Sequence, residues 1–507
     1  MNDLSFAGLS GIIVLTAYAV IMLVIGFFAG KGADASKSVR GYYLGGGGLG
    51  FTALLFTLYA TQYSGNSIVG YAPEAYRSGF LWWQSVPFMI AVIAGYLLFA
   101  PRLYVIAKRE GFVTPTDWVR HRFGSTKLAV LVALLMLWGL ANYLLEQLVA
   151  MGQGIAGLTG ETVPYQVGVV AFVLVMLIYS WTGGMRAVAF TDVMQGIALL
   201  IGIVVLLGGA LYLVDGDVAG VTRHLVETAP EKAGVPTRED SVNWLSMIVM
   251  IGLGAAVYPH AIQRIYSART ERTLKRSLAI MAWMPLVTTG VVFLVGIIGI
   301  QLFPGLSETG SEQLVGMIAN EVAGINLFFY ITMILLFGGV IAAIVSTADS
   351  ALLSFSAVIS RDVYGRFVNP RASEYKQVLV GKVAGIIAIA VLLALAWNPP
   401  STLYNIFVLK FELIVQLAPV FILGMYWRRM AAAPAFWGML AGAALAGLLT
   451  VFGLGPFYGV PGGLVGLGLN VAICVAGSLL VPAPAEESVP DGFDLPLADG
   501  EAAERPA

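Results

Sequence analysis

Polar residues interrupt the second long apolar segment of the sequence. Residues 61–67 read TQYSGNS and follow an apolar run that ends at Leu58. Gly65 weakens a helix, and the neighbouring hydroxyl and amide side chains compete for its backbone hydrogen bonds. Packing of small residues against a neighbouring helix is the alternative, but packing does not need so many polar positions. We expect a broken membrane helix whose free carbonyl oxygens can bind a cation.

A second polar cluster interrupts the ninth apolar segment. Ser346, Thr347, Asp349 and Ser350 lie within about one turn, and residues three or four apart share a helix face. A carboxylate deep in a bilayer costs about 2.5–3.5 kcal/mol on insertion scales, so a cation, a partner or water must offset that cost. Two hydroxyls and a carboxylate suit a hard cation. In the alternative, the serine and threonine hydroxyls bond back to the preceding turn and Asp349 reaches the membrane surface, which is disfavoured because aspartate is short.

Four further ionisable residues fall within apolar segments, namely Glu146, Asp192, Lys410 and Glu412. Asp192 begins a segment, so the helix dipole alone could stabilise it. Lys410 and Glu412 are two residues apart and lie on different helix faces. Either could line a water path, or the two could pair across a local break before Pro419.

Proline and histidine mark the seventh segment. Pro259 is predicted to end or kink it, because proline removes a backbone donor. His260 follows, and we interpret it as a polar residue at a helix end rather than a proton carrier. The sequence has only three histidines, so a histidine-based catalytic metal site is not expected. Motifs for ATP binding and hydrolysis are missing, and we do not expect an enzyme.

The composition is that of a membrane protein. Of 507 residues, 58% are hydrophobic and 11% charged, far below the roughly 25% charged residues of a soluble domain. The net charge of −1 gives no basic surface for nucleic acid. A single cysteine, Cys474, excludes an intramolecular disulfide framework.

Apolar segments of about 20 residues predict membrane-spanning helices. We expect thirteen spans, near 9–29, 50–72, 80–106, 127–156, 164–182, 190–214, 242–260, 276–303, 326–358, 378–397, 402–426, 433–454 and 464–481. With the N-terminus outside, 23 of the 28 lysines and arginines fall in inside loops and four outside, which favours this orientation. We expect one transmembrane domain over 1–481 and a disordered cytoplasmic tail over 482–507.

Four ordered motifs resemble the sodium:solute symporter family, which includes bacterial proline, pantothenate and sialic acid transporters and sodium–glucose carriers. The motifs are YYLGGGGLG before the second span, YSWTGGMRA at 179–187 with TDVMQG at 191–196, YPHAIQR at 258–264, and AAIVSTADS followed by SRDVY at 360–364. In the first motif a glycine replaces the family's usual basic residue. Around residues 64–76 the sequence is most similar, by eye, to the pantothenate-like members.

The resemblance implies an all-α membrane protein with the five-plus-five inverted-repeat core of the leucine-transporter type. The repeats would cover about 50–214 and 242–426. The family pattern implies a sodium site formed by the carbonyls of Ala60, Tyr63 and Ala343 and the hydroxyls of Ser346 and Thr347. A second cation site would use Asp192, Asp349 and Ser350, together with Ser346. Asp349 replaces a hydroxyl residue of the family, so the sodium stoichiometry stays open and a proton could share this site.

The resemblance also implies where the solute binds, and it assigns this role to seven residues: Gln62, Ser64, Tyr143, Glu146, Gln147, Tyr258 and Lys410. Lys410 would suit an organic acid or amino acid, whereas Gln62 replaces an acidic residue of the proline branch. The implied function is sodium-driven uptake of a small organic solute across the cell membrane, with Na⁺ as the coupling ion. The partners are the solute and the lipid bilayer, without nucleic acid or an obligatory protein partner. Proton coupling and a transporter-like membrane sensor are the alternatives.

Overall fold

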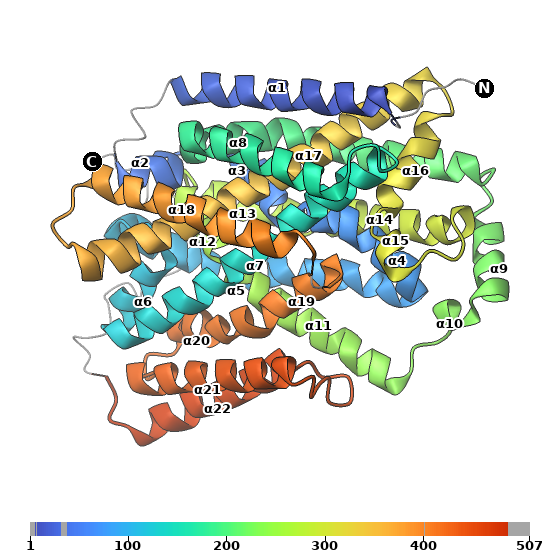
Figure 1. Ribbon diagram of the computed structural model, residues 1–507. Helices are drawn as coiled ribbons and strands as arrows, with labels where there is room; N and C mark the ends of the chain where they lie inside the picture. Colours follow the sequence, from blue (N-terminus) through green and yellow to red (C-terminus); the bar gives the residue numbers. More distant parts are fainter. Residues whose placement is uncertain (1–5, 7, 32–37, 400, 485–507) are drawn as a thin grey trace.

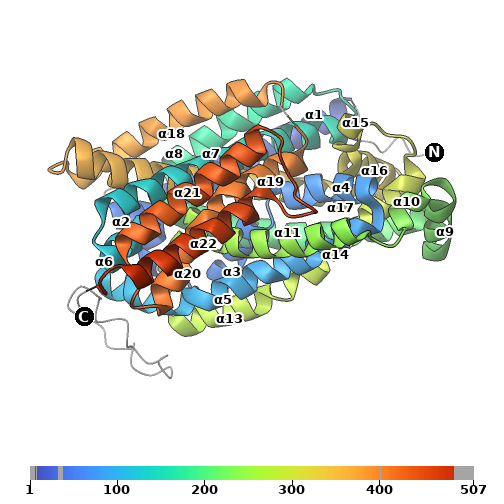
Figure 2. The ribbon, with the colours of Figure 1, turned by 90° about the horizontal axis from the view of Figure 1, so that it is seen from below.

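The computed structural model describes residues 6, 8–31, 38–399 and 401–484. Within these residues the chain is helical, and the only β pairing consists of isolated bridges, such as that between Leu49 and Ala268. The long helices run side by side, and short helices gather at both ends of the bundle (Figures 1 and 2). The all-α class expected from the apolar segments is therefore confirmed.

The elements follow one another from the N-terminal α1 to α22. The first half contains α1 (Leu9–Lys31), α2 (Val39–Leu44), η2 (Gly45–Gly47), α3 (Phe51–Gln62), η3 (Asn66–Gly70), α4 (Tyr71–Ser78), η4 (Gly79–Gln84), α5 (Ser85–Glu110), α6 (Pro115–Phe123), α7 (Thr126–Leu158), α8 (Tyr165–Leu213), α9 (Val218–Thr228) and α10 (Pro230–Ala233). The second half contains α11 (Arg238–Ala256), α12 (Pro259–Ser267), α13 (Glu271–Met281), α14 (Met284–Leu302), α15 (Glu308–Ser311), α16 (Leu314–Ala323), α17 (Leu327–Ala357), η5 (Val358–Val368), α18 (Glu374–Ala396), α19 (Leu403–Ile414), η6 (Val415–Leu417), α20 (Ala418–Tyr426), α21 (Ala432–Val451) and α22 (Gly462–Leu480).

Nine helical stretches among the described residues are long and apolar enough to cross a membrane, and a bent pair, α11 with α12, makes ten. The thirteen predicted spans are more numerous than these stretches. The first corresponds to α1, which has 23 residues, and the fifth and sixth lie together in α8. The second is divided by the break after α3. Each of the thirteen segments nevertheless has a helical counterpart. The predicted tail lies outside the described residues from 485 onward.

Helix α8 covers two predicted spans within one helical run, yet both of its ends lie at the same end of the molecule. Near its start, Thr162 accepts a hydrogen bond from the backbone of Gly8. Near its end, Gly209 packs against Val322 of α16, and α16 also contacts the N-terminal segment through Asn320. A straight helix of 49 residues would be about 74 Å long. The chain therefore reverses within α8, and residues 188–213 form a span of their own.

Two interruptions divide otherwise continuous helices near the middle of the bundle. Helix α3 ends at Gln62, and Tyr63 leaves the helical conformation with φ −106° and ψ 80°. Helices α11 and α12 meet at an angle of 51°, and Pro259 is the first residue of α12. Proline fits the first helical turn because its missing N–H would be unpaired there. Both breaks occur where the sequence predicts them.

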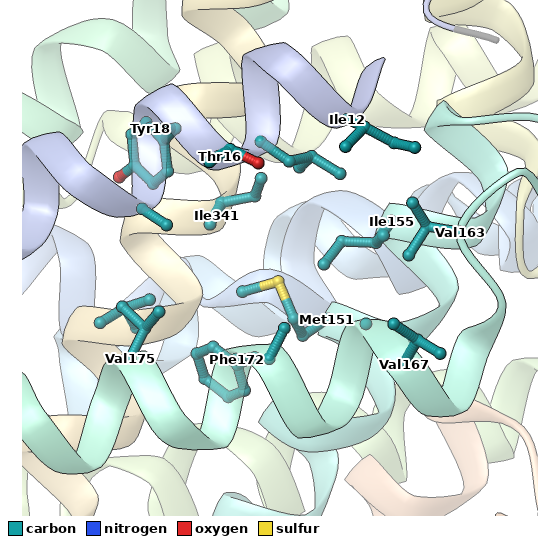
Figure 3. Close-up of a pocket in the computed structure, with 15 residues that line it drawn as sticks. Ile12, Thr16, Tyr18, Met151, Ile155, Val163, Val167, Phe172, Val175 and Ile341 are labelled. Atoms are coloured by element: carbon teal, nitrogen blue, oxygen red, sulfur yellow. The ribbon is translucent and has the colours of Figure 1, made fainter. Parts of the chain in front are cut away.

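The outermost helices flank this core on opposite sides. In Figure 1, α1 lies along one side of the bundle and the hairpin of α21 and α22 along the other. Between α1 and the helices α7, α8 and α17 is a groove of about 300 Å³. Figure 3 shows its apolar lining, which includes Ile12, Met151 and Phe172 and no charged residue. The groove is thus unsuited to an ion or a polar solute.

Candidate functional site

The C-terminal end of α3 presents backbone carbonyls to neighbouring side chains. The last four carbonyls of a helix have no partner within it. The hydroxyl of Thr347 on α17 donates to the carbonyl of Ala60 over 2.8 Å. The hydroxyl of Tyr143 on α7 donates to the carbonyl of Thr61 over 2.9 Å. Side chains from two other helices therefore satisfy the backbone of the broken helix.

Helix α17 brings the implied sodium ligands to this break. Ala343, Ser346 and Thr347 occupy one turn of α17, and all three are buried. The segment after α3 approaches α17 closely, because a Cβ atom added to Gly65 would lie 2.2 Å from Cγ1 of Ile344. The hydroxyl of Ser346 donates to Asp192 on α8, so Ser346 contacts the second implied cation site as well as belonging to the first.

The second predicted cation site is a buried cluster around Asp192. Its carboxylate accepts hydrogen bonds from Ser346 and from Thr57 of α3. The guanidinium of Arg264 on α12 lies 4.0 Å from Asp192 and donates to the hydroxyl of Ser350. The fourth predicted member, Asp349, is also fully buried on α17. Asp192, Ser346 and Ser350 thus come together around one positive side chain, and Asp349 is buried on the same helix as the two serines.

Arg264 is the main functional residue that the sequence reasoning missed. The charge count places it in a cytoplasmic loop, whereas the structure buries it completely. Its guanidinium also donates to the carbonyls of Thr57 and His260, over 3.2 and 3.1 Å. The signal was its position five residues after Pro259, because a bend at the proline turns α12 into the protein. Arg264, one of the 23 charges assigned to the inside, is therefore a core residue.

A small cavity lined by polar and aromatic side chains lies between the two helix breaks. Its lining includes five of the seven predicted solute residues, namely Gln62, Ser64, Tyr143, Tyr258 and Lys410. The other two are adjacent: Glu146 bonds to Lys410, and Gln147 accepts a hydrogen bond from the backbone of Gly65 over 3.3 Å. The cavity measures about 20 Å³. This is room for roughly one water molecule, so an organic solute can enter only if side chains move.

Lys410 and Glu146 form an ion pair at this cavity, and their side chains are 1% and 0% exposed. Lys410 lies over the ring of Tyr143, 4.2 Å from its centroid. The suggestion that Lys410 pairs with Glu412 is wrong. Glu412 accepts a hydrogen bond from the backbone of Gly463 at the start of α22, on another side of α19. Two residues along a helix point about 200° apart, which explains why the two charges meet different neighbours.

Three aromatic rings from both halves of the chain stack beside the ion pair. Tyr143 of α7 stacks on His260 of α12, with centroids 5.0 Å apart and planes at 11°. Tyr258, which precedes α12, lies 5.4 Å from Tyr143 and 4.9 Å from His260. His260 is thus a fully buried residue at the start of α12 that packs against the cavity.

A match to a known protein family shows which kind of protein contains this arrangement. The family model described as "Sodium:solute symporter family" matches residues 42–442, which include both breaks, α17 and Lys410. The chain belongs to the sodium:solute symporter family. This symporter is therefore a multi-pass membrane protein that couples transport of a small organic solute to sodium, and it is not an enzyme.

Curated relatives of this symporter are similar along most of their length. The osmoregulated proline transporter OpuE of Bacillus subtilis is 26% identical over 94% of this chain and 96% of its own. The sodium/pantothenate symporter of Escherichia coli is 27% identical, over 87% of this chain and 91% of its own. A sodium/proline symporter of Staphylococcus aureus is 26% identical over 85% and 84%.

Solved structures support the fold of the symporter. A Na⁺-coupled sialic acid symporter in a substrate-bound outward-open state aligns with a TM-score of 0.75, at 20% identity, over 94% of this chain and 99% of that one. Mhp1, a nucleobase-cation-symport-1 family transporter in a closed conformation, aligns with a TM-score of 0.55 at 17% identity, over 90% and 98%. These likenesses confirm the leucine-transporter-type architecture expected from the sequence.

Proposed function

We propose that one sodium ion binds between α3 and α17 and drives inward uptake of a small organic solute that carries a carboxylate. The ligands in this proposal are the carbonyls of Ala60, Tyr63 and Ala343 and the hydroxyls of Ser346 and Thr347. The observation that carries it is the hydrogen bond from Thr347 to Ala60, which joins two oxygen atoms across the helix break. Carbonyl and hydroxyl oxygens are suitable ligands for a hard cation.

Sodium at this position would hold α17 against the end of α3. The hydroxyl protons of Thr347 and Ser346 would turn away from Ala60 and Asp192, so that their oxygen lone pairs face the ion. The broken helix also lines the solute cavity through Gln62 and Ser64. Ordering of this segment by one ligand reduces the cost of ordering it for the other. Sodium therefore raises solute affinity, and the solute raises sodium affinity by the same factor.

The candidate second cation site has a different role in this proposal. The guanidinium of Arg264 already lies beside Asp192 and donates to Ser350. A metal ion at Asp192, Asp349 and Ser350 would have to displace a buried, hydrogen-bonded cation. We therefore assign the coupling ion to the first site and give Arg264 the role of a permanent cation at the second.

We also propose the orientation and repeat boundaries expected from the sequence. The N-terminus lies outside the cell membrane and the C-terminus in the cytoplasm, as the distribution of lysine and arginine favours. The repeats cover about 50–214 and 242–426. In support, the first long segment of each repeat is interrupted, at Tyr63 and at Tyr258.

The solute class follows from the cavity and from the relatives. Lys410 is a buried cation on its wall, which favours a carboxylate over a sugar. Proline and pantothenate, the solutes in the names of the relatives above, both carry a carboxylate. We therefore propose an amino acid or another small organic acid as the transported solute.

Thermal unfolding of the purified protein tests this function. A solute panel is measured in sodium chloride and in choline chloride, because a ligand that binds only the folded protein raises its apparent stability. We expect sodium alone to stabilise, and one solute to stabilise further only in sodium. A solute that stabilises equally in choline contradicts the coupling. Uptake driven by a pH gradient without sodium would instead support proton coupling.

A further inference from the structure

Two opposite charges lie buried at the solute cavity, and nothing in the sodium site requires them. Lys410 extends from α19 and Glu146 from α7, and their ion pair is shielded from solvent. Replacing a buried ion pair by apolar residues is often neutral or stabilising, so such a pair is weak evidence for a role in stability. Its place beside the broken helices indicates a role in recognition.

The pair restricts the charge of a solute that can replace it. A solute with only a carboxylate could bind Lys410 but would leave the Glu146 carboxylate buried without its cation. A solute with only an ammonium would leave Lys410 in the same state. Breaking a buried pair by removing one partner is strongly unfavourable. A solute that carries both groups can separate the pair and still give each charge a partner.

Two hydrogen-bonding groups next to the pair are available to such a solute. Among the described residues, the hydroxyl of Tyr258 and the Nε2 amide of Gln147 are buried and have no hydrogen-bond partner. Both are donors, and an unpaired buried donor is costly unless a ligand satisfies it. The hydroxyl of Tyr258 belongs to the cavity that Lys410 lines, so it can donate to a carboxylate there.

Aromatic rings surround the Lys410 ammonium. Its nitrogen lies 4.2, 4.6 and 5.3 Å from the ring centroids of Tyr143, Phe407 and Phe411. Aromatic faces attract cations and also provide apolar surface. When Lys410 moves toward a solute carboxylate, these rings are left to pack against the hydrocarbon part of the solute.

We infer that the transported solute is a small zwitterion whose carboxylate pairs with Lys410 and whose ammonium pairs with Glu146. The solute inserts between the two side chains, exchanging one buried ion pair for two. The Tyr258 hydroxyl gives the carboxylate a further hydrogen bond. This inference rests on the proposed sodium-coupled uptake and narrows its solute from organic acids in general to molecules that carry both charges.

Matched solutes test the charge requirement on the unaltered full-length protein. The twenty common amino acids are screened by thermal unfolding in sodium chloride. Each amino acid that stabilises is compared with its N-acetyl derivative, which has no ammonium, and with its amide, which has no carboxylate. Pantothenate provides a further carboxylate without an ammonium. We expect an amino acid to stabilise the protein and its two derivatives to lose affinity by roughly 100-fold or more.

Three results would overturn the inference. An N-acetyl derivative or pantothenate that matches the amino acids would show that the carboxylate is sufficient. An amide derivative that stabilises the protein as well as its amino acid would show that the ammonium alone is sufficient. Failure of all twenty amino acids, while sodium alone stabilises, would reject a zwitterion and leave sodium binding intact. If sodium has no effect in any of these experiments, the proposed coupling itself fails.

Substitutions assign each charge to its partner. In Glu146→Gln we expect the protein to lose its selectivity for the amino acid over the N-acetyl derivative. In Lys410→Gln we expect it to lose its selectivity for the amino acid over the amide. The double variant removes both charges and provides a folded reference if either single variant unfolds. Glu412→Gln is the matched control, because Glu412 is a carboxylate on the same helix that faces α22. Its selectivity should equal that of the unaltered protein.

Discussion

The hydroxyl of Thr347 and the carbonyl of Ala60 are 2.8 Å apart, although 287 residues separate them in the sequence. Their contact joins the polar turn of α17 to the end of α3. In the proposed mechanism, sodium replaces the proton between these two oxygens. The strength of this contact between α17 and α3 then depends on the sodium concentration.

Removal of the Thr347 hydroxyl should weaken sodium binding. In Thr347→Ala and Ser346→Ala we expect the sodium concentration for half-maximal stabilisation to rise about tenfold or more, because each variant removes one ligand of a small ion. Thr332→Ala is the control, since Thr332 lies on the same helix and its hydroxyl bonds to its own backbone at Phe328. Unchanged sodium dependence in both site variants would refute the assigned ligands.

The Gly65→Ala variant should separate α3 from α17. The added Cβ would lie 2.2 Å from Cγ1 and 2.7 Å from Cδ1 of Ile344, so the Ile344 side chain or one of the two segments must shift. We expect a lower sodium affinity, and a loss of stability of about 1–3 kcal/mol from overpacking. Gly50→Ala, in front of α3, meets no atom within 4 Å and should change neither quantity. Equal sodium titrations of the two variants would show that the close approach is not required.

Arg264 should determine how many sodium ions are coupled to the binding of one solute molecule. If its guanidinium is the permanent cation beside Asp192, the unaltered protein should show a hyperbolic dependence of solute binding on sodium. Arg264→Gln vacates that position and should make the dependence sigmoidal, whereas Arg264→Lys retains a cation. A sigmoidal curve in the unaltered protein would contradict the single-ion assignment.

Arg122 should contribute to stability without affecting transport. Its guanidinium on α6 donates to the carbonyls of Gly424, Trp427 and Arg428 at the end of α20, over 3.0–3.1 Å. Burial lowers the pKa of Arg122 to about 10, so the side chain stays charged at neutral pH. Arg122→Ala should lower the free energy of unfolding by about 2–4 kcal/mol, because it leaves one buried and two partly buried carbonyls without their donor.

Thermal unfolding and sodium titration together check the prediction for Arg122. Arg109→Ala is the reference, since Arg109 pairs with Glu110 at a partly exposed site and should contribute less than about 1 kcal/mol. A change in sodium affinity in Arg122→Ala would mean that α6 takes part in the transport cycle.

The polar residues within apolar segments were the most informative part of the sequence. Gly65 and Pro259 predicted both helix breaks, because the local preferences of glycine and proline persist in the folded protein. Ser346 and Ser350 were placed correctly on one face of α17, since residues four apart on a helix share a face, and the Ser350 hydroxyl bonds to the carbonyl of Ser346. These features depend on residues close together along the chain.

Pairings between distant segments could not be predicted. Lys410 bonds to Glu146 across 264 residues, and only the packing of α19 against α7 shows this. Arg264 resembled a loop charge because counting lysines and arginines ignores the bend that turns α12 inward. The number of spans was also difficult to define, because the reversal within α8 and the break after α3 do not produce separate long helices.

Helix α19 carries two buried charges that face different neighbours, Lys410 toward α7 and Glu412 toward the start of α22. A spin of α19 about its own axis would break both contacts at once and leave two charges without partners. A tilt or a translation together with α22 preserves the contact of Glu412 and can release Lys410 alone. We therefore expect α19 to tilt together with α22 rather than to rotate about its own axis.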